Sequence, residues 1–303
     1  MFIKLENAVS ETNLAAFPKY QGKVRDVYDI GARKLMVTTD RVSAFDRAIT
    51  TIPFKGQVLN LISRFWFEAT ASIIRNHMIA VPYANAMLVK SLKMFPLEFI
   101  VRAYMTGSTK TSIWTLYKEG QRTFNGVTLP DGMKKNQPLP DLIITPTIKS
   151  NQHDEAITDQ QILEQGILTD AQLLKIKEKL IEVFKFASGY AKSRGLILVD
   201  SKFELGLDER AQIVLGDELL TPDSSRYWRL DSYESKIRNN AEPDNYDKEI
   251  LRLYLAEHFD PYAQDQMIEI PDKIRKSLSN TYVGLYEQLT GKDFEIDAVQ
   301  LAS

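Results

Sequence analysis

The sequence predicts an α+β protein whose N-terminal part is a small antiparallel sheet. Short apolar segments at 24–30 and 34–38 flank a glycine turn, which is typical of a β-hairpin. Apolar residues recur at helical spacing from Gly56 and again from Thr169. A strongly apolar segment at 196–199 then runs into charged residues at every second position, as in a strand with one polar face.

The remaining elements divide the chain into two parts. Strands are expected at 87–89 and 99–101, with Pro96 between them interrupting any regular ladder. Pro96 therefore marks a connector, and we expect one domain at 1–95 and a larger α+β domain at 96–303.

The second part combines one long helix with the charged strand. Gly, Pro, Asn and Asp are frequent at 120–146 without a clear period, which predicts irregular surface structure. Thr169 can cap a helix that opens with a capping box and ends at Gly195. Two more helices are expected at 247–258 and 272–289.

Size and charge restrict the function only in part. The 303 residues, 44% of them hydrophobic, suffice for one large domain or two smaller ones with a core. A net charge of −2 gives no general attraction to nucleic acid or to an acidic membrane, so anion sites must come from local clusters. We therefore expect neither nucleic acid nor membrane as a partner.

The sequence contains no cysteine, which excludes disulfides, thiolate catalysis and thiolate-held zinc or iron–sulfur clusters. Residues 1–7 lack the pattern of a leader, and no segment approaches the roughly 20 apolar residues of a membrane span. These observations predict a cytoplasmic protein.

The charged strand is the most informative segment. Asp200, Lys202 and Glu204 alternate and so share one side of the strand. A second apolar segment at 213–216 ends in Asp217, and a hairpin would bring Asp217 close to the first carboxylates. Such oxygen ligands suit Mg²⁺, which keeps several waters and shares its other positions with phosphates. The alternative is an edge strand whose charged face is simply solvated.

Three segments combine cations with glycine or hydroxyl groups. Gly22, Lys23 and Arg25 lie in a turn that can cover phosphates, although a solvated hairpin is the plainer interpretation. Arg102 precedes a Thr-Gly-Ser turn, and Arg226 follows a Thr-Pro-Asp-Ser-Ser segment. An Arg with hydroxyl groups and free backbone amides can bind a phosphate monoester, so we expect two anion subsites beside the acidic hairpin.

Two other polar groups have plainer interpretations. The segment 39–47 interleaves hydroxyls, carboxylates and guanidiniums, and a helix cap with surface ion pairs explains it. His153 is more typical of a capped helix start than of a metal site. His77 and His258 are expected on helices without a partner.

Taken together, these segments resemble the phosphoribosylaminoimidazole-succinocarboxamide synthase family, the SAICAR synthetases of purine biosynthesis. The resemblance runs in order from Gly22 to about Leu255, and the chain is similar to the longer form of the family. Leu205 departs from it, since the family commonly has Phe there. The blocks that carry the resemblance are 22–26, 39–46, 96–102, 106–108, 199–206, 216–218 and 221–228.

This resemblance implies a small β lobe like that of a kinase over a larger α+β domain, with an ATP cleft between them. It also implies an ATP-dependent ligase that joins 5-amino-1-(5-phosphoribosyl)imidazole-4-carboxylate (CAIR) and L-aspartate. The products would be SAICAR, ADP and phosphate, formed through phosphoryl activation of the carboxylate. These small molecules are the expected partners of a monomer or small homo-oligomer.

The resemblance also implies roles for individual residues. Glu204 and Asp217 would hold Mg²⁺, which neutralises ATP phosphates during transfer. Asp200 and Lys202 would face the reacting carboxylate as catalytic groups. The residues expected to contact ATP are Gly22, Lys23, Arg25, Lys90 and Met94.

Substrate contacts are expected from the second domain and from the segment before the first helix. Arg102, Ser108 and Arg226 match the positions that hold the 5′-phosphate of the ribonucleotide. The candidates for the other substrate contacts, including L-aspartate, are Asp46, Lys149, Asp247, Lys248 and Arg252.

A kinase-like phosphotransferase acting on a small phosphorylated substrate is the alternative enzyme. A kinase would carry a His-Arg-Asp catalytic loop and an Asp-Phe-Gly block, and the sequence has neither. A regulatory protein that has lost catalysis is disfavoured, because the carboxylates and Lys202 are all present.

Overall fold

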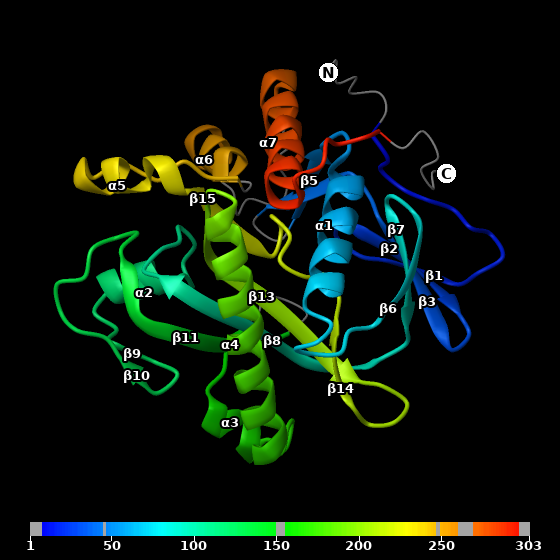
Figure 1. Ribbon diagram of the computed structural model, residues 1–303, viewed down its shortest axis with the longest axis horizontal. Coiled ribbons are helices and arrows are strands. Elements are labelled where there is room, and N and C mark those ends of the chain that lie inside the picture. The colour runs from blue at the N-terminus through cyan, green and yellow to red at the C-terminus, as the bar shows by residue number, and fades with distance from the viewer. Residues whose placement is uncertain (1–7, 45–46, 150–154, 247–248, 260–268, 297–303) are drawn as a thin grey trace.

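In the part of the chain that the computed structural model describes, residues 8–44, 47–149, 155–246, 249–259 and 269–296, two antiparallel sheets form the framework (Figure 1). The first sheet has the strand order β1-β2-β3-β7-β6 and contains the hairpin predicted from the sequence. Its strands are β1 (Lys19–Gln21), β2 (Arg25–Ile30), β3 (Arg33–Thr38), β6 (Met78–Tyr83) and β7 (Ala86–Lys90).

The second sheet is built around β13. Its strand order is β12-β11-β8-β13-β14, and β15 also pairs with β13. β13 therefore has β8 along one edge and β15 followed by β14 along the other. The strands are β8 (Lys93–Tyr104), β11 (Pro138–Ile148), β12 (Glu155–Ala156), β13 (Leu196–Leu207), β14 (Ile213–Gly216) and β15 (Ser225–Arg229). Short hairpins join β4 (Arg41–Ala44) to β5 (Arg47–Thr51) and β9 (Thr123–Phe124) to β10 (Val127–Thr128).

Helices cover the sheets, and the long helix α4 crosses the second one (Figure 1). The side chain of Thr169 accepts a hydrogen bond from the Gln172 amide and the capping box is complete, as predicted. The helix ends at Gly195, whose φ of 73° suits glycine. The helices are α1 (Lys55–Ala69), α2 (Ile113–Lys118), α3 (Asp159–Glu164), α4 (Asp170–Ser193), α5 (Leu230–Arg238), α6 (Glu249–His258) and α7 (Asp272–Thr290).

β8 is longer than the sequence predicts, and the expected break at Pro96 is wrong. The strand continues through Pro96 because its pairing with β13 changes register between Glu204 and Gly206, opposite the proline. A proline, which has no N–H to donate, is tolerated at such an irregularity. One continuous strand therefore carries Glu98 and Arg102 on the same face.

The irregular structure expected at 120–146 is also partly wrong, because β11 occupies its C-terminal part. From Ile143 to Ile148 this strand pairs regularly with β8. Its prolines hide the strand pattern in the sequence, since proline cannot donate to the ladder. β11 thereby places Lys149 at the end of a strand beside β8.

One buried cluster in the described residues includes side chains from α1, β8, β13, α4 and α7. Gly206 permits the close approach of β8 and β13, since a Cβ there would lie 2.7 Å from the carbonyl oxygen of Lys93.

The domain boundary between residues 95 and 96 stays a prediction. Every helix in the described part is too short or too polar to cross a membrane.

Asp40 caps the start of α1 from inside the protein and is not a surface residue. Its carboxylate accepts hydrogen bonds of 2.8 Å from the amides of Val9 and Gly56, and 1% of the residue is exposed. Burial raises the pKa of Asp40 to about 6, although the two amides oppose the shift. The sequence predicted a helix cap with surface ion pairs in this segment. Asp40 does cap a helix, but it is buried and so takes no part in a surface ion pair.

We expect Asp40 to make stability depend on pH. Because the folded protein binds this proton more tightly than the unfolded chain, the free energy of unfolding falls as pH rises from about 4 to about 6. Relative to Asp40→Asn, the wild type should lose about 3 kcal/mol at most across this window. Urea unfolding at several pH values measures this difference, with the exposed Asp141→Asn as control. Parallel pH profiles for wild type and Asp40→Asn would contradict the prediction.

Candidate active site

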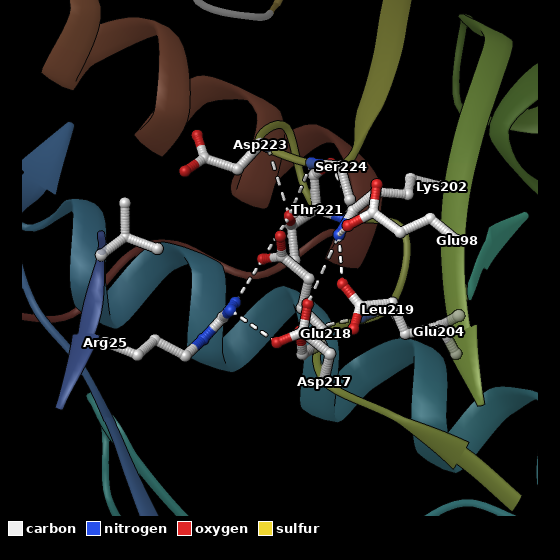
Figure 2. A network of polar contacts seen from close by, with 12 residues as sticks. Arg25, Glu98, Lys202, Glu204, Asp217, Glu218, Leu219, Thr221, Asp223 and Ser224 are labelled. Atoms are coloured by element: carbon white, nitrogen blue, oxygen red, sulfur yellow. Dashed lines mark hydrogen bonds and ion pairs between the residues drawn. The ribbon is translucent and has the colours of Figure 1, made fainter. Parts of the chain in front are cut away.

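The predicted charged hairpin is present and connects the two sheets. Glu204 of β13 is paired with Gly216 of β14, so Asp217 follows directly beside Glu204 and Lys202. Figure 2 shows Lys202, Glu98 and Glu204 directed toward one another, with Asp217 and Glu218 between them and Arg25. The interpretation as a merely solvated edge strand is therefore wrong, because β13 lies inside the sheet.

Lys202 is the central cation of this group. Its Nζ atom donates to Glu98 Oε1 at 3.0 Å and to Glu204, and it lies 3.8 Å from Asp217 Oδ2. Lys149, at the end of β11, donates to the other oxygen of Glu204 at 2.5 Å. Two lysines and three carboxylates thus meet where β8, β11 and β13 lie side by side.

Arg25 links the first sheet to the same carboxylates. Its Nη1 atom donates to Asp217 Oδ1 at 2.8 Å, and its Nη2 atom donates to Glu218 Oε2 at 2.5 Å. The hydroxyl of Thr221 also donates to Glu218, at 2.8 Å. Arg25 therefore joins the nucleotide lobe expected from the sequence to the acidic hairpin.

The local charges set the protonation of the carboxylates. Burial opposes ionisation of Asp217, but Arg25 and Lys202 outweigh it and hold the pKa of Asp217 well below its usual range. Burial and the charge of Asp217 raise the pKa of Glu204, although Lys202 and Lys149 oppose the shift. Burial disfavours the charged form of Lys202, yet Glu204 and Asp217 raise its pKa well above the ordinary value. Asp217 therefore stays ionised at neutral pH.

Glu204 and Asp217 fit a magnesium ion as a partial ligand set. Within the described residues, no group of three or more carboxylate or imidazole side chains forms a metal cage by itself. Mg²⁺ is commonly bound by only one or two carboxylates together with substrate phosphates, so two carboxylates suffice. Asp200 does not belong to this group, because it is paired with Arg226 and lies 3.7 Å from Arg102.

A cavity of about 300 Å³ adjoins the charged group and is lined by both Lys202 and Asp200. Arg102 and Arg226 both pair with the carboxylate of Asp200, and Arg102 also donates to the Thr145 hydroxyl at 2.8 Å. Burial lowers the pKa of Arg102 to about 10 despite the attraction of Asp200. The two guanidiniums and the hydroxyl groups of this cavity can bind an anion.

Ser108 lies in a neighbouring hollow that Arg226 also lines. Arg226 thus faces both the Ser108 hollow and the larger cavity with Arg102. The structure therefore brings the two predicted anion segments, which are far apart in the sequence, to the same place.

The turn between β1 and β2 is held in shape by Arg41. Arg41 donates to the carbonyl oxygens of Gly22 at 3.0 Å and of Lys23 at 3.2 Å, and it pairs with Asp26 at 2.8 Å. The side chain of Lys23 is exposed beyond this turn. Lys23 therefore lies at the surface of a turn whose backbone is fixed by Arg41.

The other nucleotide residues lie near the junction of the sheets. Met94 of β8 packs against Gly216, where an added Cβ would lie 3.0 Å from its sulfur. Lys90 ends β7, its amide donates to the carbonyl of His77 at 2.8 Å, and its side chain is exposed. Lys90 and Met94 therefore both lie close to the acidic hairpin in the folded protein.

Four predicted substrate residues give no geometric information. Asp46, Asp247 and Lys248 lie outside the described residues. Arg252 lies in α6, where its side chain is not among the described ones. Their roles stay predictions.

Sequence reasoning missed two acidic members of the site, Glu98 and Glu218. The signal for Glu98 is its spacing of four from Arg102 in one strand, which places both on the same face. Glu218 directly follows Asp217 and gave no signal of its own. Each becomes recognisable only through its partner, Lys202 or Arg25.

The expectation of a helical His77 without a partner is wrong. His77 precedes β6, its amide donates to the carbonyl of Leu215 at 3.0 Å, and its buried ring packs edge-on against Phe67. Burial lowers the pKa of His77 to about 4, so the ring is neutral at pH 7. The ring lies near Asp217, whose backbone φ of 56° is in the left-handed region. This backbone conformation costs about 1–3 kcal/mol for a residue other than glycine.

A group of cations and carboxylates beside an arginine- and hydroxyl-lined cavity is typical of an enzyme site that can bind and stabilise anionic groups. Residues 18–268 match the model of the SAICAR synthetase family. The chain belongs to this family and is an ATP-dependent carbon–nitrogen ligase of purine biosynthesis.

Named relatives and solved structures agree with this assignment. The chain is 46% identical over 290 residues to the phosphoribosylaminoimidazole-succinocarboxamide synthase of Legionella pneumophila (strain Paris), covering 96% of this chain and 93% of the relative. It is 45% identical to the chloroplastic enzyme of Arabidopsis thaliana, covering 98% and 73%.

Two solved structures share the fold. SAICAR synthase from Saccharomyces cerevisiae complexed with SAICAR has a TM-score of 0.81 and 32% identity, covering 95% of this chain and all of that chain. A type-2 SAICAR synthetase in complex with ADP has a TM-score of 0.70 and 26% identity, covering 92% and 100%. The predicted α+β class is thereby confirmed, and the ligase replaces the kinase-like alternative.

Proposed function

We propose that this protein joins CAIR and L-aspartate to give SAICAR, with conversion of ATP to ADP and phosphate. The observation that carries the proposal is the position of Lys202. Its ammonium bonds to Glu98 and Glu204, lies 3.8 Å from Asp217, and lines the cavity that contains Arg102 and Arg226. A cation there can serve both a transferring phosphoryl group and a carboxylate held in the cavity.

The chemistry requires activation of a carboxylate. An unactivated carboxylate does not accept an amine at neutral pH, so a phosphoryl group from ATP is added to its oxygen first. The aspartate amine then forms the amide bond, and phosphate leaves with the former carboxylate oxygen. In this proposal Lys202 and Asp200 face the reacting carboxylate.

ATP is proposed to lie between a lobe at 1–95 and the domain at 96–303. The residues proposed to contact it are Gly22, Lys23, Arg25, Lys90 and Met94. Support comes from the exposed Lys23 beside a turn fixed by Arg41, and from Arg25, which reaches the hairpin. A relative with 26% identity is known in complex with ADP, which supports an adenine nucleotide as the ligand.

Glu204 and Asp217 are the proposed ligands of Mg²⁺, which would neutralise the ATP phosphates when bound. The protein itself keeps Asp217 ionised through Arg25 and Lys202. Arg25 also orients Asp217 by a direct hydrogen bond.

The ribonucleotide is proposed to place its 5′-phosphate near Arg102, Arg226 and Ser108. Two guanidiniums that share one carboxylate can accept a dianion, since bidentate Arg–phosphate contacts are strong. The remaining contacts, including L-aspartate, are proposed for Asp46, Lys149, Asp247, Lys248 and Arg252.

The proposal is tested with purified protein, ATP, Mg²⁺, CAIR and L-aspartate, following ADP release and the amide product separately. We expect both products in equal amounts and only with all substrates present. ADP formed equally well without aspartate, and with no amide, would reject the ligase reaction for this chain.

A further inference from the structure

A buried ion pair borders the substrate cavity and lies outside the charged group around Lys202. Lys55, the first residue of α1, places its Nζ atom 2.7 Å from Asp223 Oδ2. The Lys55 side chain is fully buried, and 6% of the Asp223 side chain is exposed. Such a pair is costly to desolvate, so its position calls for a physical reason.

A third group completes the arrangement. Tyr282, in the middle of α7, donates its hydroxyl to the other oxygen of Asp223 at 2.7 Å. Tyr282 is also almost fully buried. Asp223 is therefore fixed from two helices at once, α1 through charge and α7 through a hydrogen bond.

Asp223 belongs to the loop at 221–225 that lines the cavity. Figure 2 shows its carboxylate directed away from Lys202 and Glu98, toward the outside of the charged group. Asp223 itself lines the cavity together with Ser224, Ser225 and Arg226. Lys55 and Tyr282 thus hold the carboxylate of a residue that also borders the substrate space.

The loop also has other anchors: the Thr221 hydroxyl donates to Glu218 at 2.8 Å, and the Ser225 hydroxyl donates to Ser201 at 2.8 Å. Its internal hydrogen bonds are short-range, from the amides of Ser224 and Ser225 to the carbonyl of Thr221. The amide of Lys202 donates to the carbonyl of Ser224 at 2.8 Å, which ties the loop to β13. A shift of Asp223 would therefore act on Arg226, the second residue of β15, and through Ser224 on Lys202 within β13.

We propose that Lys55, Asp223 and Tyr282 form a positioning cluster that fixes the loop at 221–225 and with it the anion-binding geometry of Arg226. None of the three touches substrate in this proposal. The identity of the ligand in this inference rests on the proposed function. The claim that the cluster fixes the loop does not depend on the proposed function.

The test uses two variants that avoid an unpaired buried charge. Tyr282→Phe removes one hydrogen bond at constant ring size, and the double variant Lys55→Met/Asp223→Asn removes both charges together. Tyr286→Phe, one turn further along α7, is the matched control. Thermal unfolding identifies any variant that fails to fold.

Three readouts are measured: hydrogen exchange of the peptide covering 219–227, binding of SAICAR by calorimetry, and the steady-state constants. We expect faster exchange in both variants and SAICAR binding weakened about tenfold in the double variant, since a charge-assisted anchor is lost. KM for the ribonucleotide should rise more than kcat falls, and ADP binding should stay within about twofold.

Unchanged exchange and unchanged SAICAR affinity in both folded variants would overturn the positioning role while leaving the ligase proposal intact. If wild-type protein binds no SAICAR, the proposed function fails, and the exchange data alone decide whether the cluster fixes the loop. An equal effect of Tyr286→Phe would also reject the inference, because the change would then not be specific to Asp223.

Discussion

Lys202→Met is expected to lower kcat for amide formation by about 10²–10³-fold. The ammonium bonds to Glu98 and Glu204 and reaches the cavity beside Asp200, so its loss removes the cation nearest to the developing phosphoryl charge. It also removes the positive charge that opposes a high pKa of Glu204 and Asp217, so the pKa of both carboxylates rises. Initial rates of ADP and amide formation, with saturating substrates, measure the effect.

The control for this variant is Lys175→Met, at an exposed position of α4. Circular dichroism and thermal unfolding should confirm that Lys202→Met is folded, because buried carboxylates with fewer partners reduce stability. A folded Lys202→Met variant with a kcat within threefold of the wild type would refute a catalytic role for this lysine.

Asp217→Asn is expected to raise the Mg²⁺ concentration for half-maximal activity by about 10–100-fold and to lower the maximal rate. The pKa of Asp217 is held low by Arg25 and Lys202, so the substitution removes a full negative charge at neutral pH. The amide of asparagine can still accept the hydrogen bond from Arg25, which keeps the hairpin in place. Titration of Mg²⁺ in the assay, and of Mn²⁺ with ADP by electron paramagnetic resonance, measures the change.

Asp208→Asn is the matched control for the metal prediction. Asp208 lies at the exposed end of the same hairpin, where it accepts hydrogen bonds from the amides of Arg210 and Gln212. Asparagine keeps this acceptor oxygen and removes the same charge. Identical Mg²⁺ dependence of Asp217→Asn and Asp208→Asn would exclude a metal role for Asp217.

Much of the fold was predicted from local patterns in the sequence. The capping box at Thr169, the glycine stop at Gly195 and the hairpin from β2 to β3 depend on neighbouring residues, and all three are present as predicted. The two errors about strands fall at prolines. The register is irregular opposite Pro96 and after Pro138, where the sheet tolerates a missing donor, whereas Pro146 lies within the regular pairing with β8.

The charged hairpin shows where pattern reasoning reaches its limit. Alternation along β13 placed Asp200, Lys202 and Glu204 on one side, and this holds. Alternation cannot state which partner each charge meets across the sheet. Asp200 therefore looked like a candidate for the metal group but is held by Arg226, whereas Glu98 was not assigned a role and contacts Lys202.

By itself the sequence determined the α+β class, the acidic hairpin and the family, because period, caps and ordered motifs are properties of neighbouring residues. Only the tertiary structure decided which charges meet. Arg25 and Asp217 are separated by 192 positions, and Lys55 and Asp223 come from different elements, yet each pair is in contact. Such contacts depend on how β8, β13 and α1 pack together, and packing in three dimensions is not encoded in any local spacing.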